Sequence, residues 1–262
     1  MKKNKIGTVV AKLLPPIIAI LLILLVWQLL SVSKILPSYM MPSPKRVFTA
    51  LIEDFDILCQ HGVITIWEAL LGMLIGIVVS FFLAITMDMC TPIKNSIYPL
   101  LVVSQTIPSI AIAPLLLLWF GYGILPKIIL IVITTFFPIT ISLLEGFASA
   151  DKDALRLCRS MGGNAFTEFR HIKLPGALSY FFSGLKISVT YSVIGAVISE
   201  WLGGTKGLGV YMTRVRKSFA YDKMFAVIIF IAGVSLFLLL LVTLIKWLSM
   251  PWERNKNKNV TS

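Results

Sequence analysis

The residues that could do chemistry in this 262-residue chain are few and widely spaced. The segment GGTKGLG at 203–209 has the glycines and the lysine of a phosphate-binding loop, but its spacing differs from G-x-x-x-x-G-K-[ST]. The two histidines, His61 and His171, fall on opposite sides of the membrane in the topology that the apolar segments give, which argues against a histidine metal site. No set of Ser, His and Asp falls on one face within reach for nucleophilic catalysis. We therefore expect no catalytic residue, no metal site and no ATP bound by this chain alone.

The composition of the chain is that of a membrane protein. Hydrophobic residues make up 57% of it and charged residues only 14%, whereas soluble domains are roughly half apolar and about a quarter charged. The net charge is +12, but the basic residues lie beside and between apolar runs. This distribution favours a protein in the lipid bilayer over one that binds nucleic acid. The three cysteines, Cys59, Cys90 and Cys158, are far apart and indicate no disulfide framework.

Six segments are long and apolar enough to cross a bilayer, which takes about twenty residues of helix. They predict one all-α transmembrane domain over residues 1–262, with spans at 13–31, 64–87, 97–120, 128–146, 177–202 and 224–248. The first apolar run is too long for a signal peptide and no small-residue cleavage site follows it, so we expect a retained anchor. The small-xxx-small pattern GMLIG at 72–76 predicts close packing of the second span on another helix.

An even number of spans places both termini on the same side of the membrane. If that side is the cytoplasm, the linkers near 88–96 and 147–176 are cytoplasmic too, and Lys and Arg are more numerous there than on the other side. The positive-inside rule therefore favours cytoplasmic termini in a multi-pass protein of the plasma (inner) membrane. The outer loop 206–223 nevertheless carries five basic residues, for which the sequence offers no firm account.

Four residues inside the spans suit either a translocation pathway or a structural role. Pro108 and Pro114 bend the third span, and bent helices either line a pathway or are simple kinks. Lys186 could face a pathway or extend its ammonium group back to the cytoplasmic surface. Glu200, at the outer end of its span, could contact the solute route or a partner protein, or it could pair with Lys206.

The polar linker 147–176 predicts two short helices joined by glycines at the cytoplasmic surface. Acidic residues at 151 and 153 favour the start of the first helix, and Gly162-Gly163 ends it. Asn164 is a good N-cap for the second helix, and Leu174-Pro175 is expected to stop that helix before the next span.

The second linker helix, AFTEFRHI, places Phe166 and Phe169 side by side on one face. Two exposed phenylalanines need a cover, which could be lipid headgroups, the protein's own helices or a groove in a partner protein. We expect Glu168 and Arg170, which lie between and beside them, to be solvated.

The linker resembles the EAA loop of permease subunits of binding-protein-dependent ABC importers. That loop has a glycine followed by a Leu-Pro pair, and Gly162 and Leu174-Pro175 stand at the family's spacing, with Ile172 at the usual apolar position. The family's glutamate and second alanine fall at Arg156 and Cys158, so this chain departs from the pattern there.

Two further segments resemble one branch of these permeases. PSIAIAPLLLLWFGYG at 108–123 is similar to the P-x-x-A-x-x-P-L-x-x-x-W-F-G signature of permeases for nitrate, alkanesulfonates, taurine and related small solutes. The segment 183–209, with Gly184, Lys186, Glu200 and Gly207-Leu208-Gly209, resembles the same branch. Within it, ISEWLGGTKGLGVYM at 198–212 looks most similar to permeases for pyrimidine precursors of thiamine.

The resemblance implies a type I ABC importer-like fold in which 147–176 is a cytoplasmic coupling-helix loop. It implies a homodimer, two cytoplasmic ATP-binding subunits that hold ATP and Mg, and an extracytoplasmic solute-binding protein. This chain would itself be no enzyme and would need no cofactor. The residues expected to dock the ATPase are Arg156, Cys158, Gly162, Gly163, Phe166, Phe169, Ile172, Leu174 and Pro175. Replacing Phe169 by Asp is expected to abolish ATPase association.

Two other classes of protein remain as alternatives. An ion-coupled secondary transporter, working without an ATPase, would show internal hydropathy repeats and ionisable residues near the midplane of the membrane. A membrane-embedded enzyme would need polar catalytic groups clustered at one face. Neither feature is evident in the sequence.

Overall fold

The computed structural model describes residues 5–33, 37 and 40–251. Within these residues every regular element is a helix, so the all-α fold class is confirmed. The chain divides into two compact units, residues 1–59 with 211–230 and residues 60–210 with 231–262. Helices α3 (Phe55–Met89), α10 (Leu208–Lys217) and α11 (Tyr221–Ser249) contribute to both units.

The first unit contains α1 (Lys5–Val32) and α2 (Pro44–Glu53). The segment Leu14–Val32 of α1 has a mean hydropathy of 2.4 and is almost wholly exposed, as expected for a helix covered by lipid. Its Trp27 donates a hydrogen bond to the carbonyl of Pro42 at 3.0 Å, and its ring lies 5.6 Å from that of Phe225. Helix α2 begins where Ser43 accepts a hydrogen bond from the backbone N–H of Arg46.

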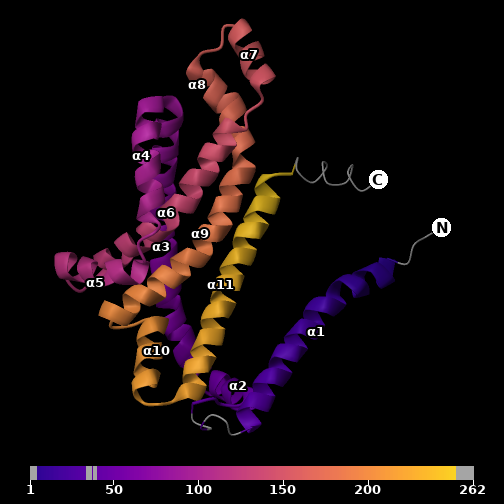
Figure 1. Cartoon of the computed structure of the whole chain (residues 1–262), viewed down its shortest axis with the longest axis vertical. Helices are drawn as coiled ribbons and strands as arrows, with labels where there is room; N and C mark the ends of the chain where they lie inside the picture. The colour runs from indigo at the N-terminus through magenta and orange to yellow at the C-terminus, as the bar shows by residue number, and fades with distance from the viewer. Residues whose placement is uncertain (1–4, 34–36, 38–39, 252–262) are drawn as a thin grey trace. The chain divides into compact units, whose positions relative to one another are not determined.

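The second unit is built on α6 (Ile124–Ala148) and α9 (Leu174–Gly203), which pack along most of their lengths (Figure 1). Close approach depends on small residues, since a Cβ atom on Gly184 would lie 2.7 Å from the carbonyl oxygen of Pro138. The expected packing at GMLIG is also confirmed. Cβ atoms on Gly72 and Gly76 would lie 2.5 Å from side-chain atoms of Ile131 and Thr135 on α6.

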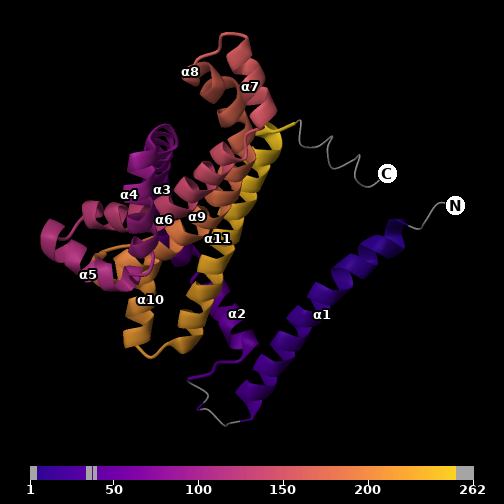
Figure 2. The same cartoon turned by 45° about the horizontal axis from the view of Figure 1, so that its top comes forward.

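The third expected span is two helices and not one. Helices α4 (Thr91–Ser104) and α5 (Ser109–Phe120) meet at an angle of 99°, and both views show α5 turning away from α4 (Figures 1 and 2). Pro108 explains the break, because a proline lacks a backbone N–H and disfavours helical geometry in the residue before it. Pro114 lies within α5 and does not end it. Counting the bent pair once, up to six segments of the described chain could cross a membrane.

The expected stop at Leu174-Pro175 is wrong. Helix α8 (Ala165–Glu168) continues through a π-helical turn, η1 (Phe169–Lys173), directly into α9. In the π-helical turn the N–H of Leu174 bonds to the carbonyl of Phe169, five residues back. This wider turn absorbs the proline without a break, and Pro175 occupies the first turn of α9. The result is one apolar helical segment from Ala165 to Gly203.

Candidate functional site

The linker 147–176 forms a helical hairpin at one end of α6 and α9 (Figure 1). Helix α7 (Lys152–Ser160) starts where the Asp151 carboxylate accepts a hydrogen bond from the N–H of Asp153 at 2.9 Å. The glycines then allow a tight turn. Gly162 has φ +83°, and a Cβ atom on Gly163 would lie 2.4 Å from Sγ of Cys158. The glycine joint and the Asn164 cap, whose side chain accepts from the N–H of Thr167 at 2.9 Å, follow the sequence-based expectation.

The two hairpin helices are fixed to each other by an ion pair that the sequence analysis missed. Arg159 donates to both carboxylate oxygens of Glu168, at 2.5 and 3.1 Å. The Glu168 side chain is only 8% exposed, so the expectation that it is solvated is wrong. A two-pronged Arg–carboxylate contact of this kind restricts geometry more than a single hydrogen bond does. A basic residue before a glycine turn and an acidic one after it are the signal that could have predicted the pair.

The two hairpin phenylalanines have different surroundings. Phe166 is 67% exposed, whereas Phe169 is half-buried and its ring lies 5.3 Å from that of Phe147 on α6. Phe169 therefore has the protein's own helix as its cover, which was one of the alternatives. Leu157 and Met161 are the other strongly exposed apolar side chains of the hairpin.

The base of the hairpin is attached to the second unit. Ile172 and Leu174 are half-buried, and Leu174 packs with Phe169 against the main hydrophobic core. Lys173 donates a 2.7 Å hydrogen bond to Asp88 at the end of α3. Arg156 and Pro175 are exposed and Cys158 is half-buried. The hairpin is thus anchored at its base and presents an apolar tip.

Glu200 lies in a buried hydrogen-bond network. It is 1% exposed, and its carboxylate accepts hydrogen bonds from the Thr65 hydroxyl and the Gly209 N–H, both at 2.7 Å. No ion pair with Lys206 is present in the described part of the chain, which corrects that alternative. Lys186 is half-buried along α9, and Pro114 is exposed on α5.

This network holds the start of α10. The N–H of Gly207 donates to Nδ1 of His61 at 3.0 Å, and that of Leu208 donates to Oγ1 of Thr65 at 2.9 Å. Together with Glu200, these groups satisfy backbone donors that a helix start leaves unpaired, and the carboxylate suits the positive end of the helix dipole. The Gly207-Leu208-Gly209 motif therefore allows the start of α10 to lie against the buried Glu200 carboxyl group.

A second buried ion pair lies between α3 and α6. Lys127 contacts Glu68 at 2.6 Å, with side chains 9% and 6% exposed, and the second oxygen of Glu68 has no partner among the described residues. In the expected topology Glu68 lies one turn inside the span 64–87, and Lys127 lies directly before the span 128–146, at the same side of the membrane. Opposite charges at equal depth were the signal that could have predicted their contact.

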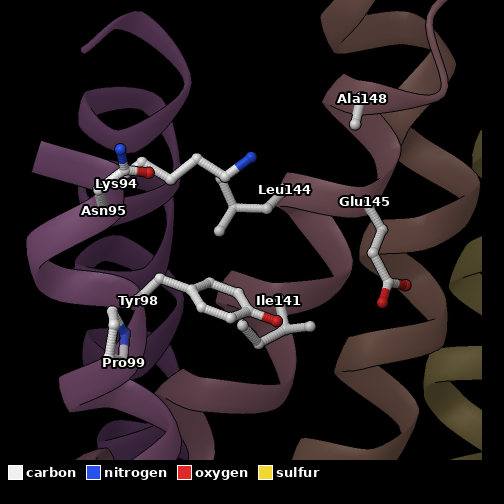
Figure 3. A pocket seen from close by; sticks show the side chains of 8 residues that line it. All are labelled: Lys94, Asn95, Tyr98, Pro99, Ile141, Leu144, Glu145 and Ala148. Atoms are coloured by element: carbon white, nitrogen blue, oxygen red, sulfur yellow. The ribbon is translucent and has the colours of Figure 1, made fainter. Parts of the chain in front are cut away.

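Two of the cavities in the described part of the chain lie along α4. One, of about 200 Å³, lies at the break itself and is lined by Pro108, Gln105 and other residues of α4, α5, α6 and α9. The other, of about 440 Å³, lies between α4 and the end of α6 that leads into the hairpin (Figure 3). Lys94 and Tyr98 on α4 face Ile141 and Leu144 on α6 across it, and Glu145 adds a carboxylate to its wall. Among the four pathway candidates, Pro108 borders the cavity at the break.

Residues 72–249 match the family described as binding-protein-dependent transport system inner membrane component. The chain belongs to this family. It is 35% identical over 225 residues to a probable ABC transporter permease protein of Haemophilus influenzae, covering 86% of this chain and 92% of that one. It is 32% identical over 244 residues to the formylaminopyrimidine transport permease protein of Halalkalibacterium halodurans, covering 93% and 97%.

The fold agrees with that of solved ABC importers. A crystal structure of an amino acid ABC transporter matches with a TM-score of 0.61 at 19% identity, covering 77% of this permease and 96% of that chain. The type I importer-like fold and the resemblance to the nitrate, sulfonate and taurine branch are therefore confirmed. The permease is a multi-pass inner membrane component of a transport system.

Proposed function

We propose that this permease is the membrane-spanning subunit of an ATP-driven importer and works as a homodimer. Each copy receives one cytoplasmic ATPase on the α7–α8 hairpin, and the ATPase holds the ATP and Mg while this chain binds no cofactor. A solute-binding protein delivers the solute on the opposite side. Both termini are cytoplasmic, on the same side as the hairpin.

The observation that carries this proposal is the hairpin itself. Its tip exposes Leu157, Met161 and Phe166, while its base is held by Phe169 and Lys173. A rigid projection with apolar side chains at its tip suits insertion into a groove on a partner protein, in which a few large side chains supply most of the binding energy.

The proposed solute is a small pyrimidine of the thiamine-precursor type. The relative named for formylaminopyrimidine transport is 32% identical to this chain, whereas the relatives named for sulfonate, taurine and nitrate transport are 26–28% identical, which supports this choice. ATP binding would draw the two ATPases together and move the two hairpins, so that solute access changes through a two-state rearrangement of the helices.

Purification of the tagged chain from its native membrane in mild detergent, with mass spectrometry of what accompanies it, tests the proposal. We expect an ATPase subunit in about equal amount and a solute-binding protein in the same preparation. A chain that purifies without an ATPase, together with uptake that survives ATP depletion but stops when the ion gradient is dissipated, would instead establish a secondary transporter.

A further inference from the structure

The break between α4 and α5 leaves backbone groups without helical partners inside an apolar segment. Within the described chain, the turns at Gln105 and Thr106 bond back to Val102 and Val103 at 3.2 and 3.0 Å, while no hydrogen bond to the carbonyls of residues 104–107 is present. Irregular backbone at membrane depth is tolerated where it is buried in protein or lines a water-filled cavity. The cavity of about 200 Å³ at this break meets that requirement.

The polar side chains that line this cavity carry no formal charge. Ser104, Gln105 and Ser109 come from the bent pair, Thr134 from α6 and Tyr191 from α9. The hydroxyl groups of Ser104 and Thr134 donate to carbonyls of their own helices at 2.7 and 2.9 Å, which leaves their oxygens as acceptors. The Gln105 side chain is exposed at the cavity, and its amide can both donate and accept hydrogen bonds.

The two helix ends at the cavity oppose each other electrically. Helix α4 ends there with the partial negative charge of its carbonyls, and α5 begins there with the partial positive charge of its free N–H groups. An anion would be attracted by the positive end of α5 but repelled by the negative end of α4. No ionised side chain on the cavity wall would compensate for the hydration that the anion loses. A zwitterion would lose the hydration of two full charges and meet only partial ones.

The apolar part of the wall suits a flat ring. Tyr191 is 45% exposed and offers an aromatic face, and Ile133 and Ile112 add aliphatic surface. The volume is below the roughly 300–1,000 Å³ of pockets that hold drug-sized ligands, which fits a solute with a single ring.

We propose that the cavity at the α4–α5 break is a solute subsite for a neutral, planar nitrogen heterocycle with hydrogen-bond donors and acceptors on its edge. This inference rests on the proposed function, because it names the solute class that the importer passes through its membrane subunit. Gln105 forms hydrogen bonds with the polar edge of the ring, and Tyr191 contacts the face of the ring.

Saturation-transfer difference NMR of the full chain in lipid nanodiscs tests the subsite, because it detects weak binding. The probes are formylaminopyrimidine at pH 8, taurine as the zwitterion and ethanesulfonate as the anion. We expect saturation transfer to the pyrimidine and little to the other two. Gln105→Leu should weaken pyrimidine binding about fivefold, since a hydrogen bond in a partly dry site is lost. Tyr191→Leu should weaken it as well.

Thr106→Val is the matched control. It removes a hydroxyl in the same break, but this hydroxyl bonds to Val103 at 2.7 Å and does not line the cavity, so binding should not change. Gln105→Arg should reverse the preference toward ethanesulfonate, because it places a full positive charge in the wall. Size-exclusion chromatography of each variant shows whether it is folded.

Three results would overturn the subsite: no binding of the pyrimidine, preferential binding of ethanesulfonate by the native chain, or equal loss in Thr106→Val and Gln105→Leu. The proposed function is tested separately by ATPase co-purification. If co-purification fails while the pyrimidine still binds at Gln105, the importer assignment falls and the subsite stands. If co-purification succeeds and the anion binds best, the subsite falls alone.

Discussion

Gly207 lies directly against the carboxyl group of Glu200. A Cβ atom on Gly207 would come within 2.1 Å of Cδ and Oε1 of that carboxyl group, and the residue has φ +123°. Two independent constraints therefore require glycine here: a backbone conformation that side chains disfavour, and a contact that leaves no room for one. Glu200 in turn holds the N–H of Gly209, so the start of α10 depends on this contact.

Replacing Gly207 by Ala should destabilise the protein by at least about 1–3 kcal/mol, because strain and steric overlap act together. Thermal unfolding in detergent measures the loss. Gly233→Ala on α11 is the matched control, since nothing lies within 4 Å of its Cβ position and its φ is not positive. Alanine in that helix should leave stability unchanged or raise it slightly. Equal unfolding temperatures for the two variants would contradict this explanation of the motif.

Phe166→Asp and Phe169→Asp should have different effects. Phe166 is exposed, so Phe166→Asp should leave the fold intact and abolish ATPase co-purification. Phe169 contacts Phe147, so Phe169→Asp should place a charge against the core and lower thermal stability. The sequence predicts that Phe169→Asp abolishes ATPase association, and the contact with Phe147 adds a loss of stability to that prediction. A Phe166→Asp variant that retains its ATPase would remove Phe166 from the docking surface.

Lys127→Met should destabilise the protein by about 3–5 kcal/mol, because it leaves the buried Glu68 carboxylate unpaired. The double variant Glu68→Gln/Lys127→Met should recover much of that loss, since neither side chain then carries a charge. Unfolding of the two single variants and the double variant completes a thermodynamic cycle. Additive losses in that cycle would show that the two side chains do not stabilise one another.

Asp54 should give the first unit an acid-sensitive component of stability. Burial alone would raise the pKa of Asp54, but hydrogen bonds from Lys223 and Tyr211 lower the pKa below its usual value of 3.8. A lowered folded-state pKa contributes stability that is complete above about pH 4 and is lost as the pH falls through the folded value. Burial and the Asp54 carboxylate raise the pKa of Tyr211, so its phenol stays protonated and donates.

Unfolding temperatures of the native chain and Asp54→Asn at pH 6 and pH 3 test this link. The native chain should lose more stability between pH 6 and pH 3 than Asp54→Asn does, because this variant lacks the titrating carboxyl group. Asp153→Asn, which alters only an exposed pair, serves as the control and should behave like the native chain. If Asp54→Asn loses as much stability between pH 6 and pH 3 as the native chain does, other carboxylates cause the acid sensitivity.

The spans could be predicted from the sequence because apolar length alone determines whether a helix can cross a bilayer. The break at Pro108 was predicted only as a bend, since proline fixes where a helix is weakened and the packing of α5 sets the angle. The role of Glu200 was not predictable, because its partners Thr65 and Gly209 lie on other helices and pair with it only after tertiary folding. The π-helical turn was not predicted either, because the sequence around Pro175 resembles an ordinary helix start.

The uninterrupted helix from Ala165 to Gly203 has a mechanical consequence. Its 39 residues span about 58 Å at 1.5 Å per residue. Phe166 lies near one end of this helix and is exposed. Glu200 lies near the other end and accepts a hydrogen bond from the N–H of Gly209 at the start of α10. A continuous helix without a hinge does not bend in its middle when a force acts on one end. We therefore expect a tilt applied at the hairpin tip to be transmitted along this helix to the contact between Glu200 and Gly209.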